Sequence, residues 1–396
     1  MINLLGLGPS ELEEVSRACG QPAYRGGQLA RWLFGRGELD LGKMTDLPRA
    51  FREHLEASGY VPGELRLVAE RQTPDGTRKV LLASPRGGTL EAVLMPHWPD
   101  LEAARSDPQG GRPERVTACI STQIGCAVGC AFCATGFSGF QRNVAAGEMV
   151  EQVIRMQGEA GYRISNVVFM GMGEPLLNYN DTLKAVRILN EEVGIGMRHL
   201  TISTSGVIPG IDRLAAERLQ LTLAVSLHAP DDTLRDALVP INRRYPLADL
   251  KAAMKRYVAQ TSRRVTIEYV LLSGVNDSPA QARELSRYLE GLNAHVNLIP
   301  YNATDALFEP SRPAEVEAFR EVIERSGRAV SVRVERGRPI DAACGQLRRR
   351  LAEGGEAIVE KDPARAREAV VAARQARSAD PGKALAGAKE HDGAGS

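Results

Sequence analysis

Short runs of β-branched and aliphatic residues alternate with longer amphipathic stretches through the middle of the chain. Six such runs predict buried strands, at 116–121, 166–170, 199–203, 221–226, 264–271 and 295–300. Helix-length stretches separate most of them, at 147–157, 182–192, 247–261 and 280–292. Such alternation predicts parallel strands joined by crossovers. Six units are too few for an eight-stranded barrel, so we expect an α/β fold with a partial, open (β/α)6 barrel; a doubly wound sheet is the alternative. In both folds, ligands bind at the carboxyl ends of the strands.

The pattern before residue 110 differs and predicts a small, mostly helical accessory domain. Helical periodicity covers 25–34 and 47–58, and strand-like runs follow at 64–70, 78–83 and 90–94. The segment 96–113 is rich in Pro, Gly, Asp and Arg and predicts an exposed loop or linker. We therefore divide the chain into an accessory domain with its linker (1–110), a core domain (111–350) and a C-terminal extension (351–396).

The C-terminal extension can bury little apolar surface. Beyond about residue 362 it consists largely of Ala, Arg, Glu and Gly, which predicts a frayed helix followed by disorder. The chain carries no apolar run of about 18 residues, and its start lacks the features of a secretory signal. We expect a cytoplasmic protein without a membrane segment.

Overall charge says little about the partners of this chain, because the formal net charge is only +1. Locally, seven arginines lie between Arg328 and Arg350 against two acidic residues, Glu335 and Asp341. That run is either a solvated surface or, together with Arg142, Arg243 and Arg244, a set of phosphate contacts for RNA.

Cysteines change the interpretation more than charge does. The six in the chain are too few for a disulfide scaffold, and three of them, Cys126, Cys130 and Cys133, lie within eight residues. They follow the first core strand, so they lie on a loop at its carboxyl end. Three thiolates can hold three irons of a [4Fe–4S] cluster and leave the fourth iron open for a ligand. The alternatives are a zinc site completed by a distant His and a redox pair.

The spacing Cys-x-x-x-Cys-x-x-Cys, with Phe132 before the last Cys, resembles the radical S-adenosylmethionine superfamily. The other segments that resemble one family within it are Cys119-Ile-Ser-Thr-Gln-Ile-Gly-Cys126, Gly139-Phe-Gln-Arg-Asn143, Met170-Gly-Met-Gly-Glu-Pro175, Ser203-Thr-Ser-Gly206, Ser226-Leu-His-Ala-Pro230, Val296-Asn-Leu-Ile-Pro-Tyr-Asn302 and Asp341-Ala-Ala-Cys-Gly-Gln346. In this order, over roughly residues 5 to 350, they resemble the dual-specificity RNA methyltransferases. These enzymes methylate carbon 2 of an adenine in 23S ribosomal RNA and of an adenine next to the anticodon in some transfer RNAs.

The resemblance implies roles for residues that the pattern alone leaves unexplained. Cys344 takes a methyl group from one S-adenosylmethionine and becomes S-methylcysteine. A second S-adenosylmethionine, cleaved at the [4Fe–4S] cluster, gives the radical that abstracts hydrogen from the methyl group of this S-methylcysteine. The resulting carbon radical adds to the adenine, and Cys119 then attacks Cys344, releasing the RNA and leaving a transient disulfide. Glu91 matches the family's acceptor for the proton on carbon 2. The 96–113 segment resembles an insertion between Glu91 and Cys119.

A second group of residues is implied to bind S-adenosylmethionine. Gly173 and Glu174 match the motif that meets its amino group, and a carboxylate suits that cationic partner. The others lie at or just past the ends of later strands and, by resemblance, line the same site: Ser203, Ser226, Leu227, His228 and Asn302.

The implied partners are 23S rRNA, tRNA and an electron donor such as flavodoxin or ferredoxin, and one chain suffices for the covalent intermediate, which favours a monomer.

Methylation at carbon 8 of the same adenine is an alternative that these motifs do not separate from carbon 2. Radical thiomethylation would need a second cluster, and the remaining cysteines lie too far apart in sequence to suggest one. A zinc-bearing RNA-binding module without catalysis is the alternative from a different class.

Overall fold

The computed structural model describes residues 1–99, 112–302 and 308–333, together with Ile340, Gln346 and Val371. Cys344 and the C-terminal extension, apart from Val371, lie outside the described residues, as does most of the 96–113 segment. No helix in the described ranges is long and apolar enough to cross a membrane.

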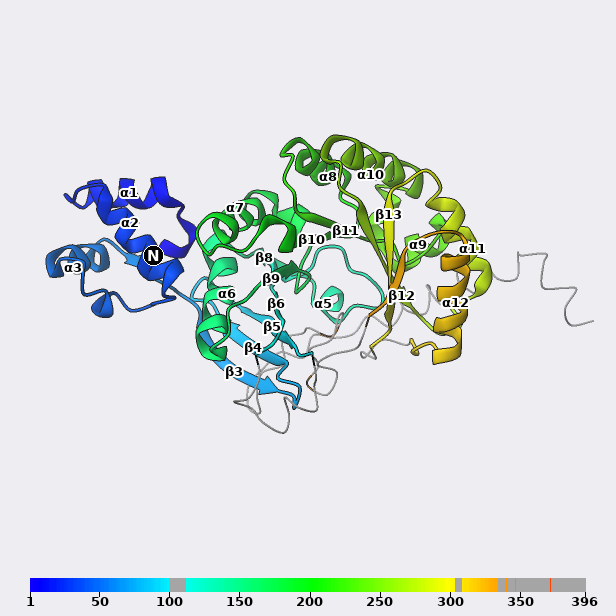
Figure 1. Ribbon diagram of the computed structural model, residues 1–396, viewed down its shortest axis with the longest axis horizontal. Helices are drawn as coiled ribbons and strands as arrows, with labels where there is room; N and C mark the ends of the chain where they lie inside the picture. Colours follow the sequence, from blue (N-terminus) through cyan, green and yellow to red (C-terminus); the bar gives the residue numbers. More distant parts are fainter. Residues whose placement is uncertain (100–111, 303–307, 334–339, 341–345, 347–370, 372–396) are drawn as a thin grey trace, which may run out of the picture.

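A ten-stranded sheet forms the centre of the protein, and it curves into an arc (Figure 1). Among the described residues, neighbouring parallel strands follow one another in chain order: β6 (Arg115–Cys119), β9 (Asn166–Phe169), β10 (Leu200–Thr204), β11 (Thr222–Ser226), β12 (Val265–Leu271), β13 (Ala294–Pro300) and β14 (Val330–Val332). A doubly wound sheet would reverse direction along this order. The observed order therefore confirms the partial barrel and excludes that alternative, and it adds β14, which the sequence pattern did not predict.

The strands before the core extend the same sheet. β3 (Arg66–Gln72), β4 (Arg78–Ala83) and β5 (Thr89–His97) form an antiparallel meander whose last strand pairs with β6. Two short pairs lie outside the large sheet: β1 (Ile2–Asn3) with β2 (Tyr60–Val61), and β7 (Gln123–Gly125) with β8 (Phe140–Asn143).

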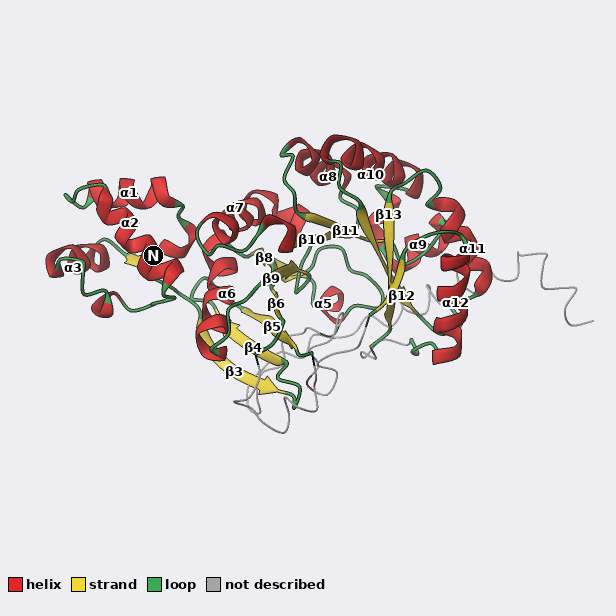
Figure 2. Cartoon of the chain, in the orientation of Figure 1, coloured by secondary structure: helices red, strands yellow, loops and turns green. Residues whose placement is uncertain are grey.

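Helices cover the outer side of the arc, whereas the short helix α5 (Ala134–Phe137) lies within it (Figures 1 and 2). The larger helices of the core are α6 (Ala146–Ala160), α7 (Tyr179–Glu191), α8 (Ile208–Ala216), α9 (Asp232–Leu238), α10 (Leu247–Thr261), α11 (Pro279–Tyr288) and α12 (Pro313–Arg325). The pattern predicted α6, α7, α10 and α11, but it did not mark α8, α9 or α12.

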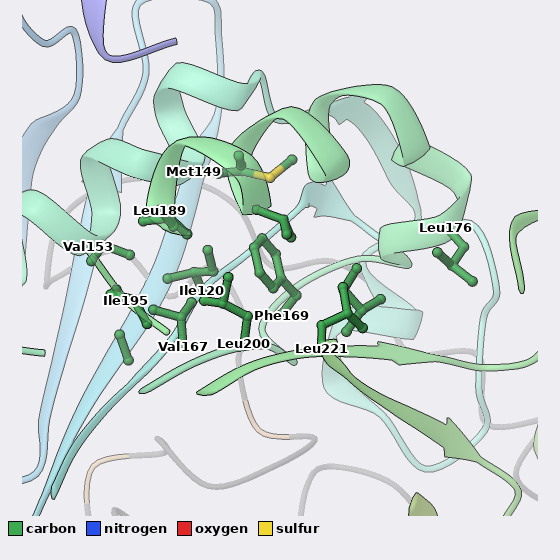
Figure 3. Packing of buried hydrophobic residues seen from close by; sticks show 14 of the residues in the cluster. Ile120, Met149, Val153, Val167, Phe169, Leu176, Leu189, Ile195, Leu200 and Leu221 are labelled. Carbon is green, nitrogen blue, oxygen red and sulfur yellow. The ribbon is translucent and has the colours of Figure 1, made fainter. Parts of the chain in front are cut away.

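Aliphatic side chains from both layers form the core between sheet and helices. Figure 3 shows Met149 and Val153 of α6 above Val167 and Phe169 of β9, all of them buried. Burying one such side chain contributes about 1.5–3 kcal/mol. This packing fixes the positions of the strand ends, where the candidate site lies.

The N-terminal helices α1 (Pro9–Ala18), α2 (Tyr24–Ala30) and α3 (Arg49–Ala57) lie at one side of the barrel (Figure 1). A buried carboxylate on α6, Glu151, connects this region to the core. It accepts hydrogen bonds from Asn3 Nδ2 at 2.9 Å and from the amides of Glu64 and Leu65 at 2.8 and 2.9 Å. Burial raises the pKa of Glu151, although these bonds and Arg155 favour the ionised form.

Candidate active site

A pocket opens at the carboxyl ends of the parallel strands and encloses about 970 Å³, including the part open to solvent. The three clustered cysteines, Cys126, Cys130 and Cys133, line one side of it. Six of the seven residues expected at the S-adenosylmethionine site also line it: Gly173, Glu174, Ser203, Ser226, His228 and Asn302. The structure thus brings together residues that are up to 176 positions apart in the sequence.

Glycines allow the loop that carries the three cysteines to turn tightly. Gly125 has a φ of +75°, and a Cβ atom there would lie 1.6 Å from the carbonyl oxygen of Gly139. A Cβ atom on Gly136 would lie 2.9 Å from the carbonyl oxygen of Cys130. The amide of Ala131 donates to the carbonyl of Leu238 at 3.0 Å, which ties the loop to the end of α9.

The three thiols lie close enough together to affect one another. Burial, with a contribution from neighbouring cysteines, raises the pKa of Cys126 to about 12 and that of Cys130 well above the ordinary thiol value. Metal ligation requires thiolates, so bound iron would offset this cost. No three His, Cys, Asp or Glu side chains in the described ranges are arranged to hold a single metal ion. Cluster thiolates bind different irons and need not surround one point.

Close packing and hydrogen bonds hold the Gly-Glu segment after β9, Gly173-Glu174, in place. Gly173 has a φ of +102°, and a Cβ atom there would lie 2.5 Å from Cβ of Gln123. The buried Glu174 carboxylate accepts from the amide and the hydroxyl of Ser205, both at 2.7 Å, and from the amide of Leu176 at 3.0 Å. Burial raises the pKa of Glu174 and these hydrogen bonds lower it. The carboxylate therefore shapes the pocket as well as lining it.

His228 contributes a neutral imidazole to the pocket. It is buried with a left-handed φ of +62°, and its Nδ1 accepts from the amide of Val270 at 3.0 Å. Burial, with a contribution from Arg235, lowers its pKa to about 3. Because Nδ1 is the acceptor, the proton of the neutral ring is on Nε2. The ring packs edge-on against Phe132 of the cysteine loop, with centroids 4.8 Å apart.

Asn302 provides the pocket with a hydrogen-bond acceptor for a polar ligand. Its Oδ1 atom is buried and accepts no hydrogen bond from the part of the chain that the structure describes. A ligand with an N–H group, such as the adenine of S-adenosylmethionine, fits this acceptor. Leu227, in contrast, is fully buried in the core, outside the pocket lining. Its amide donates to Glu268 and its carbonyl accepts from Arg235.

Cys119 and Glu91 lie on one face of the sheet, beside the pocket. Val93 of β5 is directly opposite Cys119 of β6, and Glu91 is two residues before Val93, so the three side chains share a face. Glu91 is buried and its carboxylate is 3.2 Å from Lys79 Nζ. Cys119 packs in a small apolar cluster that includes Ile340, four positions before Cys344.

Three residues of the site were missed from the sequence: Ser205, Arg235 and Glu268. Glu268 lines the pocket, and burial raises its pKa. A charged residue inside the apolar run 265–271 was a signal for it, because strands buried on both faces are continuously hydrophobic. Arg235 is in a short helix of ordinary charge pattern, which gives no such signal. Arg142, considered above for phosphate, instead forms a bidentate pair with Glu148 at 2.8 Å.

Comparisons with known proteins agree with these features. The model of the radical SAM superfamily matches residues 120–285, and that of the ribosomal RNA large subunit methyltransferase N-terminal domain matches residues 2–61. A probable dual-specificity RNA methyltransferase RlmN from Moorella thermoacetica is 47% identical over 88% of this chain and 97% of its own. One from Picosynechococcus sp. is 44% identical, covering 90% of this chain and 99% of that one. A crystal structure of a radical SAM methyltransferase from Sphaerobacter thermophilus has a TM-score of 0.81 and 48% identity, over 88% of this chain and 99% of that chain.

Proposed function

Because the chain belongs to the RlmN family of radical S-adenosylmethionine RNA methyltransferases, we propose that it methylates carbon 2 of a specific adenine in 23S rRNA and of an adenine next to the anticodon in some tRNAs. The observation that carries the proposal is the pocket, in which three loop thiols and the Gly-Glu segment meet at the strand ends. The matched ribosomal RNA methyltransferase N-terminal domain supports RNA as the substrate.

The chemistry of the substrate explains the need for these residues. Carbon 2 of adenine lies between two ring nitrogens and is too electron-poor to attack a methyl cation equivalent. A carbon radical can add to such a ring. A [4Fe–4S] cluster, when bound by Cys126, Cys130 and Cys133, supplies the electron that cleaves S-adenosylmethionine. The chain itself binds and orients S-adenosylmethionine through Glu174, His228 and the other expected contact residues that line the pocket.

The methyl group travels on the protein. Cys344 accepts it from one S-adenosylmethionine, and the second molecule of each turnover provides the radical that activates it. The adduct of the methylene carbon with the adenine carries one unpaired electron, which a cluster bound by the three thiols would take back, and Glu91 accepts the proton from carbon 2. The thiolate of Cys119 then attacks the sulfur of Cys344 and forms a disulfide. The bond from sulfur to carbon breaks with its electron pair on carbon, which takes up a proton to become the methyl group, and the RNA is freed. The disulfide is reduced before the next turnover.

The surroundings of Cys119 support this division of roles. Glu91 and Cys119 occupy one face of adjoining strands, beside the pocket. Ile340, four positions before Cys344 in the sequence, packs in the apolar cluster that contains Cys119. A one-electron donor of the flavodoxin or ferredoxin class would reduce the cluster, and the proposed cycle needs only one chain, so we propose a monomer.

The test is an anaerobic incubation of the reconstituted protein with methyl-labelled S-adenosylmethionine, reductant and a 23S rRNA fragment. Mass spectrometry of the digested nucleosides should show labelled 2-methyladenosine. Cys344→Ala should abolish the product, and Cys119→Ala should leave RNA covalently attached to the protein. Cys19→Ala is the matched control, because Cys19 follows α1 in the N-terminal region and should have no effect.

The alternative outcomes are separable. Labelled 8-methyladenosine would keep the radical mechanism and replace carbon 2 by carbon 8. An intact brown cluster that releases 5′-deoxyadenosine, without any methyladenosine, would leave the radical chemistry and refute the proposed substrate. A colourless protein that contains zinc but no sulfide would refute the cluster assignment.

A further inference from the structure

Arg235, on the short helix α9, is a fully buried cation that does not line the pocket but contacts residues that do. Its guanidinium donates to the carbonyls of Ser205, Ser226 and Leu227 at 2.7, 3.1 and 3.0 Å. Its fourth partner is Oδ1 of Asn242, at 2.6 Å. The three bonds to carbonyls tie α9 to the ends of β10 and β11, the strands that provide part of the pocket lining.

Within the described ranges, Arg235 makes no direct ion pair. The carboxylates of Asp232 and Asp236 reach it only through Asn242, whose Nδ2 donates to them at 2.8 and 2.6 Å. Burying a charge is costly unless an opposite charge compensates it, and carbonyl dipoles offset only part of that cost. Burial lowers the pKa of Arg235 to about 10, so the side chain is still protonated at neutral pH. The buried guanidinium therefore favours a further anion among its neighbours.

The cysteine loop lies next to α9. Helix α9 packs against the loop through Leu234 and Leu238, and the carbonyl of Leu238 accepts the amide of Ala131, next to Cys130. The guanidinium also holds the carbonyls of Ser205 and Ser226, which line the same pocket as Cys130. A cluster held by three thiolates is anionic, and it gains a further negative charge on reduction.

We propose that Arg235 is a positioning residue that sets the reduction potential of the cluster held by Cys126, Cys130 and Cys133. One electron passes from a flavodoxin- or ferredoxin-class donor to the cluster, with no bond broken and no proton moved. The buried guanidinium stabilises the reduced, more negative form more than the oxidised form. The same side chain holds the backbone carbonyls of Ser205 and Ser226. The guanidinium therefore keeps a fixed position relative to these two residues of the pocket lining. This inference rests on the proposed function, because it takes the three thiols as cluster ligands.

The test is an anaerobic redox titration of the reconstituted full chain, followed by the electron paramagnetic resonance of the reduced cluster. Arg235→Gln removes the charge and Arg235→Lys keeps it. In the Gln variant, the ratio of reduced to oxidised cluster at the wild-type midpoint should fall about tenfold, which is about 59 mV for a one-electron couple. The Lys variant should stay close to wild type. Arg52→Gln is the control, because Arg52 also donates to two backbone carbonyls but lies in the N-terminal region.

Iron and sulfide content is measured first in every protein. If the Gln variant binds too little iron to titrate, retention of the cluster by the Lys variant supports the proposal, whereas equal loss from both overturns it. Equal midpoints for the wild type and the Gln variant overturn this inference alone. A wild-type protein that binds no cluster overturns the proposed function and this inference together.

Discussion

Replacing Glu148 by Gln should weaken the attachment of β8, the strand that follows the cysteine loop. Glu148 lies at the start of α6, and its buried carboxylate accepts from Nη1 and Nη2 of Arg142 on β8, both at 2.8 Å. It also accepts from the amide of Ala145 at 2.8 Å, as the third residue of a capping box. The pair thus fixes β8 to the helix that packs behind β6 and β9.

The magnitude follows from the exposure of the two partners. Removing one partner of a buried ion pair costs about 3–5 kcal/mol. The Arg142 side chain is 22% exposed and still donates to the carbonyls of Gly87 and Asn143, so it is not left buried and unpaired. We therefore expect about 2–3 kcal/mol. With a urea m-value of about 3 kcal/mol/M, the unfolding midpoint should fall by somewhat less than about 1 M.

The pH dependence has a definite sign. Burial raises the pKa of Glu148, but the hydrogen bonds from Arg142 and Ala145 outweigh it, so the pKa is lowered. A lowered folded-state pKa means that the stabilisation is fully present above the ordinary carboxyl value of 4.5 and is lost as the pH falls through the lowered pKa. The difference between the wild type and the Gln variant should therefore shrink in acid.

Urea titrations of both proteins at pH 7 and at decreasing acidic pH, followed by circular dichroism, measure these differences. The matched control is Glu315→Gln, because Glu315 is also the third residue of a capping box and pairs with Arg312, but on the exposed surface of α12. That control should leave the midpoint unchanged. An unchanged midpoint for Glu148→Gln at pH 7, or a difference that persists undiminished in acid, would refute the reasoning.

Three further predictions concern the pocket. Gly125→Ala should lower the iron content after reconstitution severalfold, because its Cβ atom would collide with the carbonyl of Gly139; full iron content would show that the loop can shift. His228 should remain neutral, with its proton on Nε2, down to pH 5, as 15N NMR of the imidazole can test; a transition near pH 6.5 would contradict its pKa of about 3. Asn302→Ala should raise KM for S-adenosylmethionine about tenfold with a smaller change in kcat, as expected for one lost hydrogen bond; an unchanged KM would mean that Oδ1 does not meet the ligand.

The sequence pattern located most of the parallel strands well because each is a short run of β-branched and aliphatic residues that differs clearly from the amphipathic stretches around it. The run 264–271 became β12 at Val265–Leu271, and 295–300 became β13 at Ala294–Pro300. β14 escaped notice because three half-buried residues are too few to show a period. The strand-like runs before residue 97 were also found, but the pattern cannot tell which sheet a strand joins. That depends on long-range pairing, here of Val93 with Cys119.

The motifs located the pocket but not the side chains that support it. Residues such as His228 and Asn302 follow strands directly, so the placement of strand ends at one rim was enough to bring them together. Arg235 reaches the same rim from a helix, and no periodic feature of α9 marks it. Leu227 belongs to the motif, yet its amide donates to Glu268 of β12 and its carbonyl accepts from Arg235 of α9. A motif therefore contains residues with a structural role as well as residues that line the pocket.

Ser205 explains why such support is hard to see in a sequence. Its amide and hydroxyl both donate to the Glu174 carboxylate, whereas its carbonyl accepts from Arg235. Two of these three contacts are made by backbone atoms, which every residue except proline has, so the type of side chain at this position carries little information about them. The rim is consequently a connected network from Gln123 through Glu174, Ser205 and Arg235 to Asn242. Coupled residues of this kind respond to substitution non-additively. Changes at Glu174 and Arg235 should therefore not be interpreted as independent effects on the cofactor and on the cluster.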